Sequence, residues 1–307
     1  EITYGDWSSD VCSSDLSDLA RPYRITHGKG FRLKDVDPGD TGALKSEDKP
    51  RAKEALQIGV EALAELQDML YAQDRWALLL IFQALDAAGK DGTIKHVMSG
   101  VNPQGCQVFS FKKPSSEELD HNFLWRYMRS LPERGRIGIF NRSYYEDVLV
   151  VKVHPELIGR EVPRINDKIG KKFWEARYED INAFERHLVR NGTIILKFFL
   201  NVSKDEQKAR FLERLNRPEK NWKFSPSDLA ERSHWDDYME AYEDALSATS
   251  TEWAPWYVVP ADYKWVTRAV VADIVTSTIQ GLDLKYPEVT AEKKKLLDEA
   301  RVKLAAE

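Results

Sequence analysis

Residues 83–95 carry the pattern in this sequence that most directly suggests chemistry, QALDAAGKDGTIK. The pattern follows a continuous apolar run, so it reads as a buried strand that leads into a glycine-containing loop and a helix. In the phosphate-binding pattern G-x-x-x-x-G-K-[ST], backbone N–H groups surround phosphate oxygens and the lysine neutralises their charge. Gly89 and Lys90 fit this pattern, but Ala84 replaces the first glycine and Asp91 replaces the usual Ser/Thr. We expect a phosphate-binding loop rather than a turn in which Lys90 is merely solvated.

Asp86 lies inside the same loop and adds a second chemical requirement. A carboxylate in a phosphate-binding loop repels its ligand unless a divalent cation lies between the two groups. Carboxylate and phosphate oxygens are the ligands that Mg²⁺ prefers. Asp86 therefore predicts bound Mg²⁺, with Mn²⁺ as the alternative cation.

The elements that must position this loop alternate along the chain. Apolar runs of strand length predict strands at residues 76–82, 107–111, 137–140, 193–200 and 256–259. Helical spacing of apolar residues predicts helices at 51–72, 116–130 and 165–190. Strand alternating with helix is typical of a parallel sheet in a layered α/β fold. The ends of such strands face a ligand crevice, so the loop at 83–95 is expected at that edge.

The chain is expected to form one large domain with flanking segments. Residues 1–16 are rich in Ser and Asp without helical or strand period, and we interpret them as non-native. Residues 17–50 are predicted to form an arm on the surface. Residues 51–290 form the predicted phosphate-binding domain, including a helical lid at about 204–248. Residues 291–307 are predicted to form a C-terminal helix that packs on the body or on a neighbouring subunit.

The composition excludes several classes of protein. Of 307 residues 42% are apolar, but no apolar run reaches the roughly 20 residues that span a bilayer. A net charge of −5 provides no general attraction to nucleic acid, and two cysteines are too few for a disulfide framework. The start of the sequence shows no secretory signal. We therefore expect a cytoplasmic protein that binds neither nucleic acid nor membrane.

Five long motifs extend the pattern and resemble one known family. They are QALDAAGKDGTI, SFKKPSSEELDHNFLWR, FNRSYYEDVLVVKVHP, RPEKNWKFSPSDLAERSHWDDYMEAY and TSTEWAPWYVVPADYKW. These motifs resemble the polyphosphate kinase 2 family, and the resemblance runs from about residue 56 to about residue 284. The resemblance implies a thymidylate-kinase-like P-loop kinase fold of three layers, a parallel sheet with a helical lid, and Mg²⁺. It also implies inorganic polyphosphate and a nucleotide as the two substrates.

The resemblance assigns roles to residues at the ends of two predicted strands. The catalytic residues it implies are Asp86, Lys90, Asn141 and Arg142, and the metal ligands it implies are Asp86, Asn141, Glu146 and Asp147. The segment expected around the transferred phosphoryl group comprises Ala87, Ala88, Gly89, Asp91, Gly92 and Thr93. Many family members have aspartate where Asn141 stands, so Asp86 is expected to do more of the cation binding here. Arg142 suits a phosphoryl oxygen, although a capping ion pair with Glu146 or Asp147 is the alternative.

Basic residues elsewhere are candidates for binding the polyanion. In the predicted lid they are Arg210, Arg214, Arg217, Lys220 and Lys223, and after the second predicted strand they are Lys112 and Lys113. We expect Arg210, Arg214, Arg217 and Lys223 to face the site. The alternative is a solvated helix face, because acidic residues are interleaved with the basic ones.

The function that the resemblance implies is reversible transfer of a phosphoryl group from polyphosphate to AMP and ADP. The YYED motif, which contains Glu146 and Asp147, looks like the class III subgroup that accepts both nucleotides. The expected partners are adenine or guanine nucleotides and further copies of the chain in a dimer or tetramer. The alternatives are an ATP-dependent nucleoside monophosphate kinase and a non-catalytic polyphosphate-binding protein.

Overall fold

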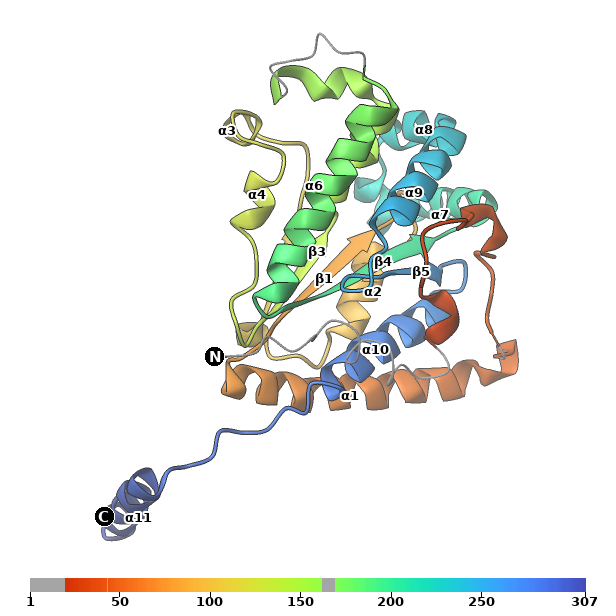
Figure 1. The fold of residues 1–307 in the computed structure, drawn as a ribbon. Helices are drawn as coiled ribbons and strands as arrows, with labels where there is room; N and C mark the ends of the chain where they lie inside the picture. The colour runs from red at the N-terminus through yellow and green to blue at the C-terminus, as the bar shows by residue number, and fades with distance from the viewer. Residues whose placement is uncertain (1–19, 43, 162–168) are drawn as a thin grey trace.

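A computed structural model of the chain describes residues 20–42, 44–161 and 169–307. Its centre is a five-stranded parallel sheet in the order β2-β3-β1-β4-β5 (Figure 1). The strands are β1 (Ala77–Gln83), β2 (Cys106–Ser110), β3 (Ile137–Asn141), β4 (Thr193–Asn201) and β5 (Trp256–Pro260). Each strand overlaps a run predicted from the sequence, so the predicted parallel α/β fold is confirmed. The proposed non-native segment 1–16 lies outside the described residues.

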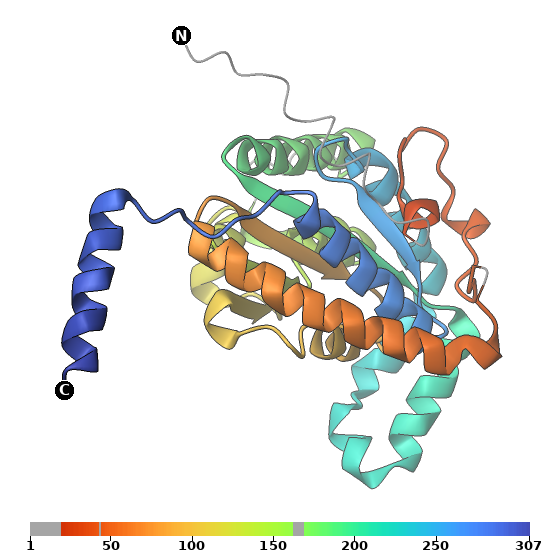
Figure 2. The same cartoon turned by 90° about the horizontal axis from the view of Figure 1, so that it is seen from below.

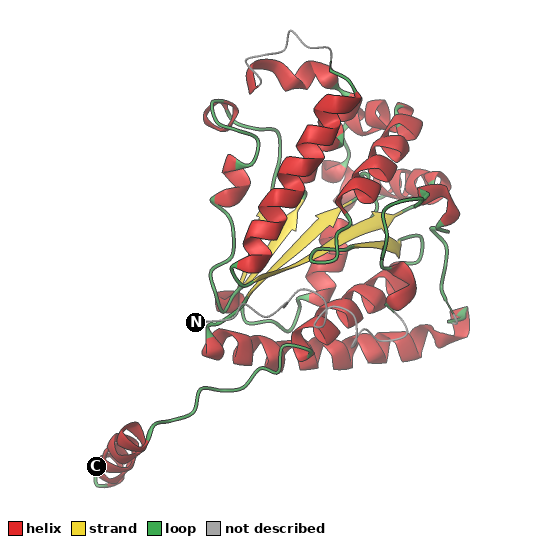
Figure 3. Cartoon of the chain, viewed as in Figure 1, coloured by secondary structure: helices red, strands yellow, loops and turns green. Residues whose placement is uncertain are grey.

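Helices surround the sheet on both sides (Figure 3). The α-helices are α1 (Lys49–Gln73), α2 (Lys90–Val97), α3 (Ser116–Leu119), α4 (Trp125–Met128), α5 (Val150–Val153), α6 (Lys171–Arg190), α7 (Lys204–Asn216), α8 (Pro226–Ser233), α9 (Trp235–Thr249), α10 (Lys264–Gln280) and α11 (Ala291–Ala305). Short 3₁₀ helices are η1 (Arg21–Tyr23), η2 (Leu33–Asp35), η3 (Ser46–Asp48), η4 (Pro103–Gly105), η5 (Tyr144–Val148), η6 (Pro155–Glu161) and η7 (Pro218–Lys223).

The central strand β1 is covered on both faces, and all its residues are buried. Leu78, Leu80 and Phe82 point into a core shared with α1, α2 and α10, whereas Leu79 and Ile81 point into a second core shared with α6 and α9. Successive side chains of a strand point to opposite faces, so a continuous apolar run fits a strand with a layer on each side. The sheet between two helical layers is the predicted three-layer arrangement.

The helix predicted at 116–130 is wrong in its continuity. The segment instead forms two single turns, α3 and α4, joined by residues 120–124. Ser115 and Glu118 form a capping box that starts α3, and the Asn122 side chain accepts a hydrogen bond from the Leu124 N–H before α4. Polar side chains that bond nearby backbone groups compete with a continuous helix. For the helix predicted at 165–190, the structure gives α6 from Lys171, and residues 165–168 lie outside the described part.

The described part of the predicted N-terminal arm lies along the sheet edge. The N–H of Ile25 donates to the carbonyl of Trp256 on β5, and Tyr23 and Leu33 are buried. At the other end, α11 stands away from the rest of the chain in both views (Figures 1 and 2). Every residue of α11 is exposed, so packing on the body is wrong and packing on a neighbouring subunit stays a prediction.

The predicted lid at 204–248 divides into two parts. The helical arm, which we define as residues 204–233, contains α7, η7 and α8 and projects from the body (Figure 2). In contrast, α9 contributes Ala241, Ala245 and Leu246 to the second core. Because those side chains are buried against the body, the projecting part is shorter than the predicted lid.

The strand order fixes where a ligand site belongs. After β1 the chain crosses to β2, returns to β3 beside β1, and then moves to β4 on the other side. In open parallel sheets, ligands bind beyond the carboxyl ends of the strands where the order reverses. The segments that follow β1 and β3 therefore form the candidate site. Within the described ranges, none of the helices combines the length and the apolar content needed to cross a membrane.

Candidate active site

The loop after β1 has the backbone of an anion-binding turn. Ala87 has φ 63° and Gly89 has φ 113°, so both lie in the left-handed region, and Lys90 begins α2 directly afterwards. Alternating right- and left-handed residues turn successive backbone N–H groups toward one side, and a helix N-terminus adds its dipole. Gly89 fits this position because a side chain at φ 113° is strained. Gly92 and Thr93 lie in the first turn of α2.

Lys90 is held inside this loop rather than in solvent. Its Nζ donates to the carbonyl of Ala84 at 2.6 Å and to that of Leu85 at 3.3 Å, and only 8% of the residue is exposed. Burial, aided by the charge of Arg142, lowers the pKa of Lys90 to about 8, although Asp86 and Glu146 partly oppose the shift. The alternative of a solvated lysine at this position is wrong.

Arg142 follows β3 and connects the two strand ends. Its Nη2 lies 2.8 Å from Oδ1 of Asp86, and its Nη1 lies 3.6 Å from Oε2 of Glu146. The Gln83 side chain donates to the other oxygen of Glu146 at 2.9 Å. Arg142 also has φ 65°, which is strained for a residue with a side chain. The structure thus brings Asp86, Lys90, Arg142 and Glu146 together, and the ion pair with Glu146 forms alongside the one with Asp86.

Asn141 lies at the end of β3 but faces the start of α2. Its Nδ2 donates to Oδ1 of Asp91 at 2.7 Å. Asp91 stands at the usual Ser/Thr of the loop pattern and Asn141 stands where many family members have aspartate, so this bond joins one departure from the loop pattern to one departure from the family pattern. Asn141 and Asp91 form a pair beside the loop.

Asp147 is placed differently from the prediction. The residue is 7% exposed, its Oδ1 lies 3.7 Å from Nη1 of Arg177, and its Oδ2 accepts a hydrogen bond from Tyr127. It therefore faces α6 and α4 rather than Asp86. The structure therefore does not bring Asp147 together with Asp86 and Glu146 as the predicted metal site requires, and Arg177 already neutralises its charge.

A cavity of about 260 Å³ opens over the strand ends. Its charged lining residues are Asp86, Glu146, Asp228, Glu231, Arg142 and Arg232. Four carboxylates against two guanidinium groups leave an acidic excess where an anionic substrate would bind. Burial and the charge of Asp86 raise the pKa of Asp228. The chemistry of this lining suits a cation bound between carboxylate and phosphate oxygens.

Sequence reasoning missed the residues that cover this cavity from the far side. Asp228 and Glu231 come from α8, and Tyr238 and Tyr242 come from α9. The Tyr238 hydroxyl donates to Oε2 of Glu231, which also lies 3.0 Å from Nε2 of His154. The signal was present in the motif FSPSDLAERSHWDDYMEAY, whose acidic and aromatic residues recur at helical spacing. The candidates predicted in the lid were all basic, so these carboxylates were not among them.

Arg210 does not face the cavity as predicted. Its Nη1 donates to the carbonyls of Ala87 and Ala88, its Nη2 to those of Ala261 and Asp262, and its Nε to Glu206. Only 5% of the residue is exposed. Because these bonds use all five N–H groups of the guanidinium, Arg210 holds the phosphate loop in place and has no donor left for a ligand.

The other basic candidates lie at or near the surface. Arg214 lies 3.8 Å from Asp228, which places it beside the cavity. Arg217 and Lys220 form ion pairs with Glu213, Arg217 also with Glu219, and Lys223 lies over the ring of Trp222. Lys112 and Lys113 are exposed in the loop after β2. The structure therefore does not bring these residues to the strand ends, apart from Arg214.

Comparison with known proteins identifies the family. The family described as Polyphosphate kinase 2 matches residues 43–287. The chain belongs to this family. It is 54% identical over 282 residues to an ADP-polyphosphate phosphotransferase of Rhodopseudomonas palustris, covering 90% of this chain and 98% of that one. It is 45% identical over 279 residues to an AMP/ADP-polyphosphate phosphotransferase of Meiothermus ruber, covering 91% and 100%.

A solved relative supports the same assignment at the level of the fold. The crystal structure of Polyphosphate Kinase 2 from Arthrobacter aurescens TC1 superposes with a TM-score of 0.83 at 42% identity, covering 93% of this chain and 98% of that one. The chain thus has the P-loop kinase fold of the family, as its motifs predicted. The resemblance inferred from the five motifs is confirmed, and the chain is a member of a kinase family.

Proposed function

We propose that this chain transfers a phosphoryl group from inorganic polyphosphate to ADP and to AMP, reversibly. The observation that carries the proposal is the position of the Arg142 guanidinium between Asp86 and Glu146, next to the loop that holds Lys90. These groups lie beyond the adjacent strands β1 and β3, where the sheet order reverses. Membership of the Polyphosphate kinase 2 family supports polyphosphate as the phosphoryl donor or product.

The chain's own residues act by positioning and by neutralising charge. The N–H groups of the loop and the Lys90 ammonium hold oxygens of the transferred group, and the planar fork of Arg142 fixes a second set. Phosphoryl transfer requires an in-line arrangement of donor and acceptor oxygens more than any covalent chemistry of the protein. Arg142 joins both strand ends, so it aligns the group held by the loop with the acceptor.

A divalent cation fits the donor set of the cavity. Among the residues that the structure describes, no three carboxylate, imidazole or thiolate groups gather as a metal site. At phosphoryl-transfer sites Mg²⁺ binds through one or two carboxylates and the substrate phosphates, so such a cluster is not required. Asp86 would hold the ion, and the Asp91–Asn141 pair would lie nearby. Glu146 would lie on the side of the acceptor nucleotide. When bound, Mg²⁺ supplies charge neutralisation between the two phosphate groups.

The choice of acceptor depends on Glu146 rather than on Asp147. The relative from Rhodopseudomonas palustris is named for ADP alone, and that from Meiothermus ruber for AMP and ADP. AMP presents its acceptor oxygen one phosphate nearer the nucleoside than ADP does, which leaves a gap between that oxygen and the transferred group. A carboxylate that lines the cavity could hold a cation or a water molecule in this gap. Glu146 lines the cavity and Asp147 does not. We expect Glu146→Gln to reduce kcat/KM for AMP more than for ADP.

One set of assays tests the proposal against its alternatives. Polyphosphate, Mg²⁺ and ADP should give ATP, and AMP in place of ADP should give ADP and then ATP. Formation of ADP from ATP and AMP without polyphosphate would favour a nucleoside monophosphate kinase. Polyphosphate binding without turnover on either nucleotide would favour a non-catalytic binding protein. Turnover of ADP but not of AMP would restrict the proposal to diphosphates.

A further inference from the structure

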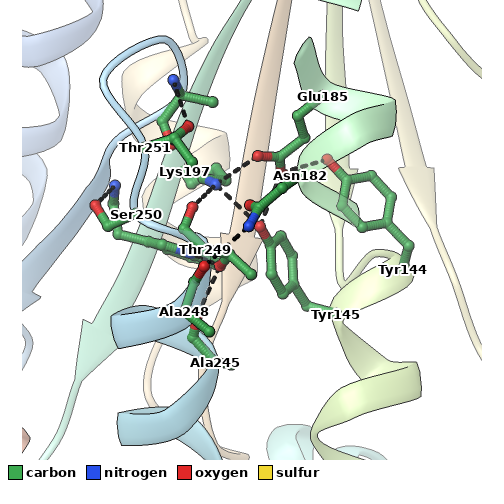
Figure 4. A network of polar contacts seen from close by, with 12 residues as sticks. Tyr144, Tyr145, Asn182, Glu185, Lys197, Ala245, Ala248, Thr249, Ser250 and Thr251 are labelled. Atoms are coloured by element: carbon green, nitrogen blue, oxygen red, sulfur yellow. Dashed lines mark hydrogen bonds and ion pairs between the residues drawn. The ribbon is translucent and has the colours of Figure 1, made fainter. Parts of the chain in front are cut away.

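A buried polar network lies behind the candidate site, in the core between the sheet and α6 (Figure 4). Nζ of Lys197, on β4, donates to Oε2 of Glu185 at 2.6 Å, to the hydroxyl of Tyr145 at 2.9 Å and to the carbonyl of Thr249 at 2.7 Å. The other oxygen of Glu185 accepts hydrogen bonds from Tyr144 at 2.9 Å and from Tyr145 at 2.8 Å. Lys197 and Glu185 are each 0% exposed.

The cost of this network makes a purely structural role a poor explanation. Removing an ammonium and a carboxylate from water costs several kcal/mol for each ion, and an apolar pair of similar volume is often as stable or more stable. Burial lowers the pKa of Lys197, and the neighbouring Glu185 opposes that shift. Every donor of Lys197 nevertheless has an acceptor, so the ammonium form is fully bonded in the core. The network therefore depends on ion pairing and on the directions of its hydrogen bonds rather than on the volume of its side chains.

The network holds the turn that carries Arg142. Tyr144 and Tyr145 follow Arg142 by two and three residues and are fully buried. Between them and Arg142, the Ser143 hydroxyl accepts a hydrogen bond from the Tyr145 N–H, and the Arg142 N–H donates to the carbonyl of Phe82. The φ of 65° at Arg142 is a strained conformation that persists only where its surroundings hold it. The two tyrosine hydroxyls provide that constraint from one side, and β1 provides it from the other.

The same lysine also contacts the helix that covers the cavity. Thr249 is the last residue of α9, and Tyr238 and Tyr242 of this helix line the cavity. Asn182 of α6 adds a bond from its Nδ2 to the carbonyl of Ala248 at 2.9 Å. One cation therefore links the sheet, the Arg142 turn and the end of α9.

We propose that Lys197 and Glu185 are positioning residues that hold the hydroxyls of Tyr144 and Tyr145 and thereby fix the Arg142 guanidinium against Asp86. The inference deepens the proposed function, because Arg142 acts on a phosphoryl group only if that function is correct. Lys197 and Glu185 touch no substrate and act only through the turn. Their loss should therefore lower kcat through misplacement of Arg142 and leave the KM for the nucleotide nearly unchanged.

The experiment compares two double variants with a control that destabilises a different part of the core. Tyr144→Phe/Tyr145→Phe removes the two hydroxyls but keeps both rings, and Lys197→Met/Glu185→Leu removes both charges together. Val275→Ala on α10 is the control, because it opens the core on the other face of the sheet. Misplacement of a reacting group by a fraction of an ångström should lower kcat at least about tenfold in both double variants. The control should keep the kcat of the unmutated chain at a temperature well below its Tm.

Hydrogen exchange gives a readout that does not depend on turnover. Peptides that cover residues 140–150 should exchange faster in both double variants, because the Arg142 and Glu146 N–H bonds of the turn are loosened. Peptides of α10 should not change in the double variants. If the unmutated chain shows no polyphosphate-dependent turnover, the proposed function fails, and the exchange alone still decides whether the network holds the turn.

A cycle with Arg142→Lys identifies the residue through which the network acts. If the tyrosines act through Arg142, removing their hydroxyls in the Arg142→Lys chain should lower kcat little further. Fully additive losses would overturn the proposal. Unchanged kcat and unchanged exchange in Tyr144→Phe/Tyr145→Phe would overturn it as well, as would a loss of kcat without faster exchange of the turn.

Discussion

Basic residues occur both beyond the carboxyl ends of β1 and β3, which we call the strand-end region, and on the helical arm. The two regions hold these residues in different ways. At the strand ends Lys90 is 8% exposed and bonded to loop carbonyls, and Arg142 lies on Asp86 and Glu146. On the arm, Arg217 has 49% of its side chain exposed and pairs with Glu213 and Glu219 of its own segment. Charges that the surrounding loops fix in place act on a transition state, whereas ion pairs within one exposed segment are screened and contribute little. We therefore expect position, rather than charge alone, to separate residues that act on the transferred group from residues that only bind polyphosphate.

Among the substitutions that test this comparison, Lys90→Ala should cause the largest loss of activity. Removing a fixed cation beside a transferring phosphoryl group should lower kcat by about 10²–10³-fold. Lys95→Ala is the matched control, because Lys95 is an exposed lysine of the same helix α2. Steady-state assays with saturating polyphosphate should show the loss only in Lys90→Ala, with circular dichroism spectra unchanged in both. A near-normal kcat in Lys90→Ala would contradict the assignment of this loop as a phosphate-binding loop.

Asp86→Asn should produce the next largest loss, because the amide keeps the shape but not the charge of the proposed cation ligand. We expect kcat to fall about 10²-fold and the Mg²⁺ concentration for half-maximal rate to rise. Titration of Mg²⁺ and Mn²⁺ at fixed nucleotide measures both quantities. Glu231→Gln, which changes a cavity carboxylate on α8, tests whether the effect is specific to the loop. Equal metal responses in the two variants would contradict a special role for Asp86.

Arg210→Lys tests a residue of the helical arm whose hydrogen bonds connect it to the phosphate loop of the strand-end region. Lysine cannot reach the carbonyls of Ala87, Ala88, Ala261 and Asp262 together, so the loop should loosen. We expect the Tm to fall by roughly 5 °C and kcat to fall about tenfold, with the KM for polyphosphate changed less. Thermal unfolding and steady-state kinetics check the two effects. If only the KM for polyphosphate rises, Arg210 would be a substrate-binding residue after all.

The pH dependence should follow the lysine that the loop buries. Because the pKa of Lys90 is lowered to about 8, the ammonium form that neutralises phosphate is present below that pH and is lost above it. The value of kcat/KM, which reports the free enzyme, should therefore fall about tenfold per pH unit above about pH 8. Lys90→Arg, which stays charged, should lose this alkaline decrease at whatever activity it retains. An identical alkaline decrease in Lys90→Arg would assign it to another group.

Arg217→Ala should have the smallest effect. Its guanidinium is exposed and already paired on the arm, so we expect the KM for polyphosphate to rise only about two- to threefold, with kcat unchanged. The slope of log KM against log salt concentration should become slightly smaller. Arg301→Ala, an exposed ion-paired arginine on α11, is the matched control. A large fall in kcat would show that the arm reaches the reacting group.

Much of the fold could be predicted because the signals are local. The apolar run before the loop has strand length and lacks alternation, which requires a strand covered on both faces, and β1 confirmed this. The loop motif is also contiguous, so Lys90 and Asp86 could be placed together from the sequence alone. The prediction for 116–130 was wrong because capping by Ser115 and Asn122 outweighed the helical pattern of apolar residues.

The sequence by itself determined the five strands, the phosphate loop and the family, because each is written in neighbouring residues. Only the tertiary structure decided which charged side chains share the site. Glu146 and Asp147 are adjacent in the 3₁₀ helix η5, where one residue turns the side chain by about 120°, so one faces the cavity and the other faces Arg177. The tertiary structure likewise decided where Arg210 and the carboxylates of α8 lie. Their partners lie far away in sequence, and only the packing of α7, α8 and α9 over the strand ends brings them together.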